Sequence, residues 1–130
     1  MIRSHQVMDL FLEACPSYRK RLERYIEDNY EPEDKRLPYI ELADFAKHVF
    51  DLYSQERTEE FEAIFETVET LQTEGDQETK ELAIVGFLED LQNVILSSGS
   101  VQLEDFVPFL GPVSRSSWRQ LIDYWDGKKV

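Results

Sequence analysis

The sequence is poor in several features that would decide its class at once. It has a single cysteine, Cys15, so no disulfide can form within one chain, which favours a reducing compartment. No apolar run approaches the roughly 18 residues that a membrane-spanning helix needs, and the first residues lack the pattern of a signal peptide. We therefore expect a cytoplasmic protein that does not associate with membranes.

Catalytic and metal-binding signatures are also missing. The two histidines, His5 and His48, lie far apart, and together with Cys15 they cannot form a usual structural zinc site. Cys15 precedes a proline and is expected to be a small buried residue at a helix junction, and His48 is expected at a surface or boundary. No phosphate-binding glycine loop, nucleophile elbow, HExxH pair or EF-hand loop is present. The sequence therefore predicts a protein that is not an enzyme and that needs no cofactor and no metal.

Positive charge is scarce. The chain has 14 Lys and Arg against 27 Asp and Glu, which gives a formal net charge of −13. Such a surface repels nucleic-acid phosphates, so we expect no nucleic-acid partner. It suits either a basic protein partner or simple solubility.

What the sequence does contain is helical periodicity along its whole length. Apolar residues recur at spacings of three and four, and no alternating strand pattern of useful length is present. The five glycines and five prolines fall mostly between the periodic segments. We predict an all-α fold, a single domain over residues 1–130 that forms a bundle of six to seven helices.

The segment from about 77 to 97 is predicted to be the central helix of this bundle. Asp76 is its expected N-cap, and residues 82–88, LAIVGFL, are apolar on every side, as in a buried helix. Gly86 costs roughly 1 kcal/mol relative to alanine in a helix interior. We therefore expect a neighbouring helix to approach closely at Gly86.

The central helix turns polar towards its C-terminal end. Glu89 and Asn93 are four residues apart and share a face, with Gln92 beside them. One interpretation is that the helix leaves the core here and that its amides bond to neighbouring backbone. The other is a polar recognition patch at the end of a rigid helix.

The densest acidic stretch precedes the central helix. Residues 56–81 hold ten acidic residues and two basic ones. We predict that Thr58 caps a helix here, and that four glutamates form a row along one side of it. This acidic row comprises Glu59, Glu62, Glu66 and Glu69. Like charges at such spacings repel each other by roughly 0.2–0.5 kcal/mol per pair.

Two explanations of the acidic row remain open. It is a solvated face relieved by salt bridges, or it is a docking surface for a basic partner. The basic residues that could relieve it are Arg19, Lys20, Arg21 and Arg24. Among the aromatic residues, Tyr30 and Tyr39 flank a charged loop and are the best interface candidates.

Three blocks of the sequence resemble a known family. They are TEEFEAIFETVE (58–69), EGDQETKELAIVGFLEDLQN (74–93) and FVPFLGPVSRSSWRQLIDYW (106–125), and the region that they span is about half of the chain. They resemble small acidic all-helical bacterial proteins of poorly defined function, which are associated with polymorphic-toxin loci as immunity proteins. The resemblance implies an all-helical domain without catalytic residues and assigns no role to any single residue.

These observations lead to one principal hypothesis and several alternatives. The protein is expected to be an immunity protein that binds and neutralises a cognate bacterial toxin domain, itself basic, through an acidic surface. The expected partner-binding residues are Glu59, Glu62, Glu66 and Glu69, followed by Glu89 and Asn93. The main alternative is a non-catalytic helical adaptor that binds through an exposed apolar groove. A nucleic-acid mimic and an enzyme are the remaining readings, and the pattern indicates no particular oligomeric state.

Overall fold

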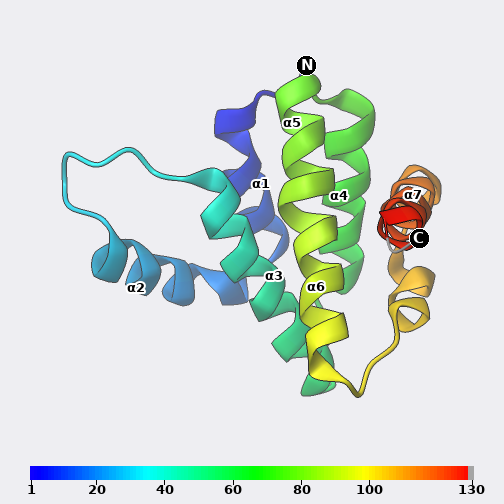
Figure 1. Cartoon of the computed structure of the whole chain (residues 1–130). Coiled ribbons are helices and arrows are strands. Elements are labelled where there is room, and N and C mark those ends of the chain that lie inside the picture. Colours follow the sequence, from blue (N-terminus) through cyan, green and yellow to red (C-terminus); the bar gives the residue numbers. More distant parts are fainter. Residues whose placement is uncertain (129–130) are drawn as a thin grey trace.

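The computed structural model describes residues 1–128 and is built from helices (Figure 1). Over this range it has α1 Val7–Ala14, α2 Arg19–Asn29, α3 Pro38–Ser54, α4 Phe61–Glu74, α5 Gln77–Glu81, α6 Glu89–Ser98 and α7 Pro112–Lys128. Short 3-10 turns lie at Ser4–Gln6, Pro16–Tyr18 and Leu103–Phe109. The predicted all-α fold with six to seven helices is thus confirmed. None of the helices within residues 1–128 is long and apolar enough to cross a membrane.

The predicted central helix is present as one continuous rod. α5, a π-helical segment over Leu82–Leu88, and α6 follow each other without a break (Figure 1). Asp76 caps the rod as expected, because its carboxylate accepts a hydrogen bond of 2.9 Å from the Thr79 N–H. The π-helical segment was not predicted: in it the backbone hydrogen bonds span five residues instead of four.

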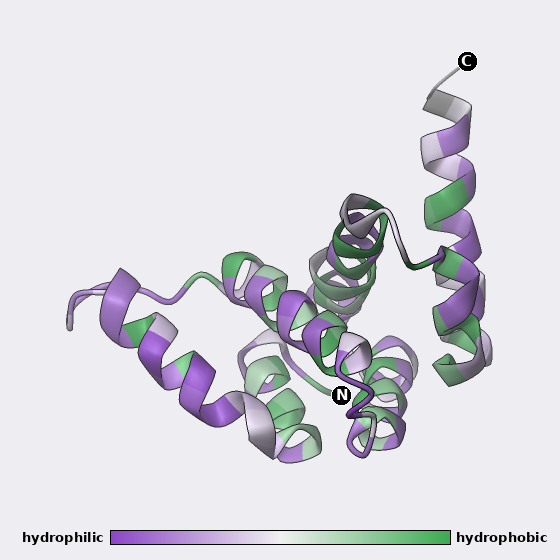
Figure 2. Ribbon diagram, turned by 90° about the horizontal axis from the view of Figure 1, so that it is seen from below, coloured by the Kyte–Doolittle hydropathy of each residue, from purple (hydrophilic) through white to green (hydrophobic). Residues whose placement is uncertain are grey.

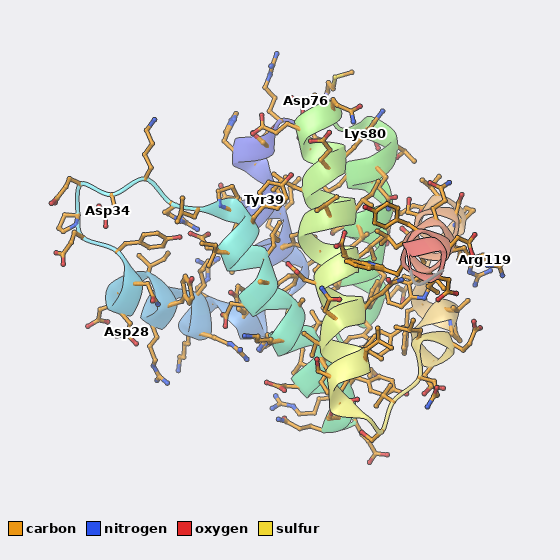
Figure 3. The ribbon with its side chains drawn as sticks, viewed as in Figure 1. Asp28, Asp34, Tyr39, Asp76, Lys80 and Arg119 are labelled. Atoms are coloured by element: carbon orange, nitrogen blue, oxygen red, sulfur yellow. The ribbon has the colours of Figure 1, made fainter. Side chains whose placement is uncertain are left out.

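The rod and α3 approach each other closely at Gly86. A Cβ atom at Gly86 would lie 3.0 Å from Leu42 Cδ1 and 3.3 Å from Tyr39 Cδ1, so the predicted close approach is confirmed. Tyr39 lies in the first turn of α3, beside the rod (Figure 3). The expectation of burial on every side is wrong at Val85, which is 47% exposed, because no described element covers that side of the rod.

Phenylalanines from three helices form the centre of the core. Phe11 of α1, Phe45 of α3 and Phe87 of the π-helical segment have ring centroids 4.8, 5.3 and 5.4 Å apart, and all three are fully buried. Phe65 of α4 joins them at 6.2 Å from Phe87. Full burial of such a side chain contributes about 1.5–3 kcal/mol, so these rings fix the relative positions of α1, α3, α4 and the rod.

The helices α2 and α7 lie on opposite sides of this core. α2 and the loop that follows it stand at one edge of the molecule, and α7 stands at the other (Figures 1 and 2). α7 lies across the direction of α4 and the rod, and its last turns extend away from the other helices (Figure 2). Its first half is anchored by Trp118, which is 1% exposed. The surface of α4 is therefore bordered by α7 on one side and by α1 on the other.

Candidate functional site

The structure divides the acidic row into residues with different surroundings. α4 begins at Phe61, later than predicted, because residues 58–60 form a turn in which the Phe61 N–H bonds to the Thr58 carbonyl oxygen at 3.1 Å. Thr58 is therefore not the N-cap, and Glu59 lies in the turn before the helix. The row is continuous only from Glu62 onwards.

Glu69 caps the start of α7. Its carboxylate accepts hydrogen bonds from the Val113 N–H at 2.9 Å, from the Ser114 N–H at 2.9 Å and from the Ser114 hydroxyl at 2.8 Å. The first N–H groups of a helix have no partner within the helix, and a negative charge there is stabilised by the helix dipole. A Cβ atom at residue 111 would lie 2.7 Å from the Glu69 carboxyl, so Gly111 lets the carboxylate come this close. Partial burial raises the pKa of Glu69, but the hydrogen bonds outweigh it and the pKa lies below its ordinary value.

A buried polar network continues from this cap between α4 and α7. The Gln72 amide donates to the Ser114 hydroxyl at 2.8 Å, and the Ser117 hydroxyl donates to the Gln72 carbonyl oxygen at 2.6 Å. All three side chains are buried. Buried polar groups need partners, and here each side chain supplies one for the next. The network therefore fixes α7 against α4 in one register.

Glu60 performs a similar task at the other end of α4. Its carboxylate accepts a hydrogen bond from the Ser17 N–H at 3.1 Å and another from the Ser17 hydroxyl, at the 3-10 turn that leads into α2. Partial burial raises the pKa of Glu60, but the hydrogen bonds from Ser17 outweigh it and lower the pKa overall. This role could not be predicted from the sequence, because Ser17 and Glu60 are 43 residues apart.

The remaining glutamates of the row have no such partners. Glu59, Glu62 and Glu66 are exposed, and none of them has a hydrogen bond or ion pair with another residue of the described range 1–128. The expected relief from α2 does not occur there, because Arg21 instead bonds to Asp44 at 3.0 Å and to Asp51 at 3.2 Å. This group of three, called the free acidic face from here on, keeps its charge for solvent or for a partner.

The polar end of the rod also divides into two parts. Gln92 is buried, and its amide donates to the Trp118 carbonyl oxygen at 3.1 Å, which holds α7 to α6. Asn93 is exposed and Glu89 is half-buried. The structural interpretation is confirmed for Gln92, whereas the recognition patch stays a prediction for the exposed Asn93.

Asn93 lines an open groove between α6 and α3, away from α4. The groove has a volume of about 530 Å³, and Lys47 and Asp90 also line it. Burial raises the pKa of Asp90 to about 6, and the neighbouring charge of Glu89 adds to this while Lys47 opposes it. Asp90 therefore loses and gains its charge close to neutral pH.

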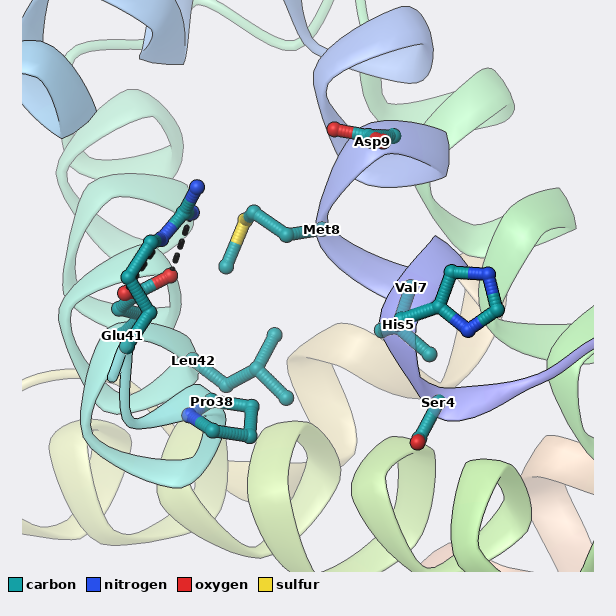
Figure 4. A pocket seen from close by; sticks show the side chains of 9 residues that line it. Ser4, His5, Val7, Met8, Asp9, Pro38, Glu41 and Leu42 are labelled. Atoms are coloured by element: carbon teal, nitrogen blue, oxygen red, sulfur yellow. Dashed lines mark hydrogen bonds and ion pairs between the residues drawn. The ribbon is translucent and has the colours of Figure 1, made fainter.

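A cavity of about 370 Å³ lies between α1 and the start of α3 (Figure 4). Met8, Pro38 and Leu42 form apolar parts of its lining (Figure 4). At its edge the buried Glu41 carboxylate accepts hydrogen bonds from Arg36 at 2.7 and 2.9 Å and from the Tyr30 hydroxyl at 2.8 Å. The Tyr30 hydroxyl is thus used within the chain, whereas Tyr39, the other aromatic candidate, is 42% exposed.

One cluster has the residue types of a catalytic triad: Ser17, His48 and Glu60. Its hydrogen bonds argue against Ser17 as a nucleophile. The His48 Nε2 lies 3.0 Å from the Ser17 hydroxyl, and that hydroxyl donates its proton to Glu60. In a serine hydrolase the histidine accepts the serine proton, and the carboxylate bonds to the histidine. Nearby Cys15 is buried as expected, and burial raises the pKa of its thiol to about 12, which keeps it from forming a reactive thiolate.

Comparison with known proteins identifies the family but not a function. No curated protein and no solved structure matches the chain significantly. Residues 8–126, which run from α1 into the last turns of α7, match the family described as "Domain of unknown function (DUF7674)". Because the match covers nearly the whole chain, the protein belongs to the DUF7674 family.

Proposed function

We propose that this protein is an immunity protein, which binds a basic bacterial toxin domain and occludes its active site. The observation that carries the proposal is the free acidic face, whose three carboxylates are exposed and unpaired within residues 1–128. The net charge of −13 supports it further, because long-range attraction speeds the association of oppositely charged proteins.

The contrast within α4 adds to this argument. Glu60 and Glu69 each compensate the unbonded N–H groups at the start of another segment, so folding alone accounts for them. Glu62 and Glu66 repel each other by roughly 0.2–0.5 kcal/mol and make no compensating contact with a described residue. Recognition of a basic partner gives these two charges a role, and the resemblance to immunity proteins of polymorphic-toxin loci is in line with it.

Glu89 and Asn93 have a secondary place in the proposal. They lie on α6, and Asn93 lines the groove towards α3, so they are not part of the free acidic face. A toxin domain that contacts both regions would have to reach across the bundle. The primary contacts are therefore Glu59, Glu62 and Glu66, with Glu69 supporting the adjacent start of α7.

The test is co-purification with an inactivated toxin candidate encoded next to this protein. We expect a stoichiometric complex that weakens as salt is raised, and protection of cells that express the active toxin. Reversal of Glu59, Glu62 and Glu66 to lysine should weaken binding about tenfold or more at low salt. The matched control reverses three other exposed carboxylates to lysine: Glu27, Asp28 and Glu104. Equal binding by both triple variants would refute a role for the free acidic face.

A second candidate function, a helical adaptor, is favoured by a different observation. Leu37, Tyr39 and Ile40 at the start of α3 and Val85 of the rod are 42–50% exposed, and Tyr39 lies against Gly86, the residue that follows Val85. An exposed apolar patch of this kind binds partners in a way that depends little on salt. A partner that is retained at high salt and lost on Ile40→Asp and Val85→Asp would support the adaptor and not the immunity protein.

A further inference from the structure

A groove between α1 and α4 adjoins the free acidic face. The two helices run in opposite directions: the Ile2 N–H bonds to the Glu74 carbonyl oxygen at one end of α4, and Ser17 bonds to Glu60 at the other. The groove between them has a volume of about 330 Å³. It therefore has α1 as one wall and α4 as the other.

The floor of this groove is formed by apolar side chains, two of which are alanines. Leu10 and Ala14 of α1 line it together with Ala63 and Leu71 of α4. Ala63 is exposed and has a small side chain. Small residues on a helix surface allow another helix to approach closely. The eight residues of α1 extend over about 12 Å, which matches about two turns of a docked helix.

Both walls of the groove carry a carboxylate. Glu13 of α1 and Glu66 of α4 line it, both are exposed, and neither has a hydrogen bond or ion pair within residues 1–128. Glu62 follows one turn away on the α4 side. An occupant that places apolar side chains on the floor would therefore meet negative charge on both flanks.

We propose that the groove between α1 and α4 binds a cationic amphipathic helix of the partner protein. The occupant has a narrow stripe of small or medium apolar residues and carries Lys or Arg on both sides of it. The stripe packs on Leu10, Ala14 and Ala63, and the basic groups reach Glu13 and Glu66. This inference rests on the proposed function for the identity of the partner, a basic toxin domain, but not for the chemistry of the groove.

The experiment measures the binding of a labelled helical peptide to the full chain by fluorescence anisotropy at low salt. The probe has about 16 residues, long enough to hold a helix, with an Ala and Leu stripe flanked by Lys. A scrambled peptide of the same composition has no stripe. We expect the striped peptide to bind about tenfold more tightly than the scrambled one, because only the striped peptide can use the floor and both walls.

Variants of the protein separate the walls from the floor. The double variant Glu13→Gln with Glu66→Gln should bind the striped peptide about tenfold more weakly. The control, Glu27→Gln with Glu104→Gln, changes the net charge equally and should leave the affinity for the peptide unchanged. Ala63→Trp should abolish binding by filling the floor, and circular dichroism reports whether that variant is folded. Absence of binding by the unmodified protein overturns the proposal, and so does equal weakening by both glutamine pairs.

Failure of the groove proposal can be distinguished from failure of the immunity proposal. If the peptide binds as expected but no toxin domain is neutralised, the groove is a cationic-helix site and the immunity proposal fails. The other outcome is that a toxin domain is neutralised as well by the two groove variants as by the unmodified protein. These variants are the double variant Glu13→Gln with Glu66→Gln, and Ala63→Trp. The immunity proposal then stands and the groove proposal fails.

Discussion

Glu66 and Glu69 lie one turn apart on α4, and the structure gives them opposite roles. Glu69 accepts three hydrogen bonds at the start of α7, whereas Glu66 is exposed and has no partner within residues 1–128. Glu60 and Glu62 repeat this contrast at the other end of the helix. Two of these four glutamates are thus internal caps and two are surface charge. What distinguishes them is whether the start of another helical segment lies opposite.

The largest expected effect comes from removing the Glu69 cap. Glu69→Ala leaves two backbone N–H groups and the buried Ser114 hydroxyl without their acceptor, and should lower the free energy of unfolding by about 2–3 kcal/mol. Glu66→Ala should change it by less than about 0.5 kcal/mol. Urea denaturation of both variants tests the contrast, and equal losses would show that Glu69 is surface charge as well.

A smaller loss is expected at the Glu60 cap. Glu60→Ala removes the acceptor of the Ser17 N–H and hydroxyl and should cost about 1–2 kcal/mol, because Ser17 is exposed whereas Ser114, which Glu69 caps, is buried. Glu62→Ala, two residues further along the chain, is the matched control. Amide hydrogen exchange at the start of α2 should accelerate in the Glu60 variant alone. Unchanged exchange there would contradict the capping role.

The caps should also make stability depend on pH. The pKa values of Glu60 and Glu69 are lower in the folded than in the unfolded protein, so the folded state binds fewer protons. Their contribution is complete above the ordinary glutamate pKa and is lost as pH falls through the lowered folded values. Protonation of Glu60 and Glu69 should destabilise the protein less than their replacement by alanine does, because a protonated carboxyl keeps part of its hydrogen bonds. Acid unfolding of a Glu60→Gln and Glu69→Gln variant should show a shallower pH dependence than that of the unmodified protein, and an equal slope would contradict this.

The smallest effect should have the opposite sign. Glu66→Gln removes the repulsion between Glu62 and Glu66, and should stabilise the protein by about 0.2–0.5 kcal/mol at low salt. The gain should vanish in 1 M salt, where the Debye length is about 3 Å. Thermal melts at the two salt concentrations measure it. A destabilised Glu66→Gln variant would mean that Glu66 has a partner within the chain.

Local signals predicted much of the fold. The central helix, its Asp76 cap and the close approach at Gly86 could be inferred because the signal for each, the apolar run, the aspartate and the glycine, lies within this one segment. The caps by Glu60 and Glu69 could not, because their partners are 43 to 45 residues away and any of many glutamates could have filled the role. A possible signal was Gly111-Pro112 at the start of α7, where the glycine leaves room for a carboxylate.

The candidate site was predicted in composition but not in arrangement. The sequence placed Glu59, Glu62, Glu66 and Glu69 in one row, and the structure leaves only Glu59, Glu62 and Glu66 unpaired within residues 1–128. Glu13, which faces Glu66 across the groove, was not singled out, because its position opposite α4 depends on the antiparallel packing of α1. Long-range packing therefore decides which acidic residues can act together.

The π-helical segment gives the central rod a freedom that an unbroken α-helix lacks. Each residue advances an α-helix by about 100°, so deletion of one residue would rotate the rest of the helix by about 100° and break its packing contacts. A stretch with wider turns can shed a residue and become α-helical, while Leu82 at one end and Gln92 at the other keep their facing sides. The number of residues in this segment can therefore change without changing which side chains of the rod face the core. Members of the family that differ by one residue here would still assemble the same bundle.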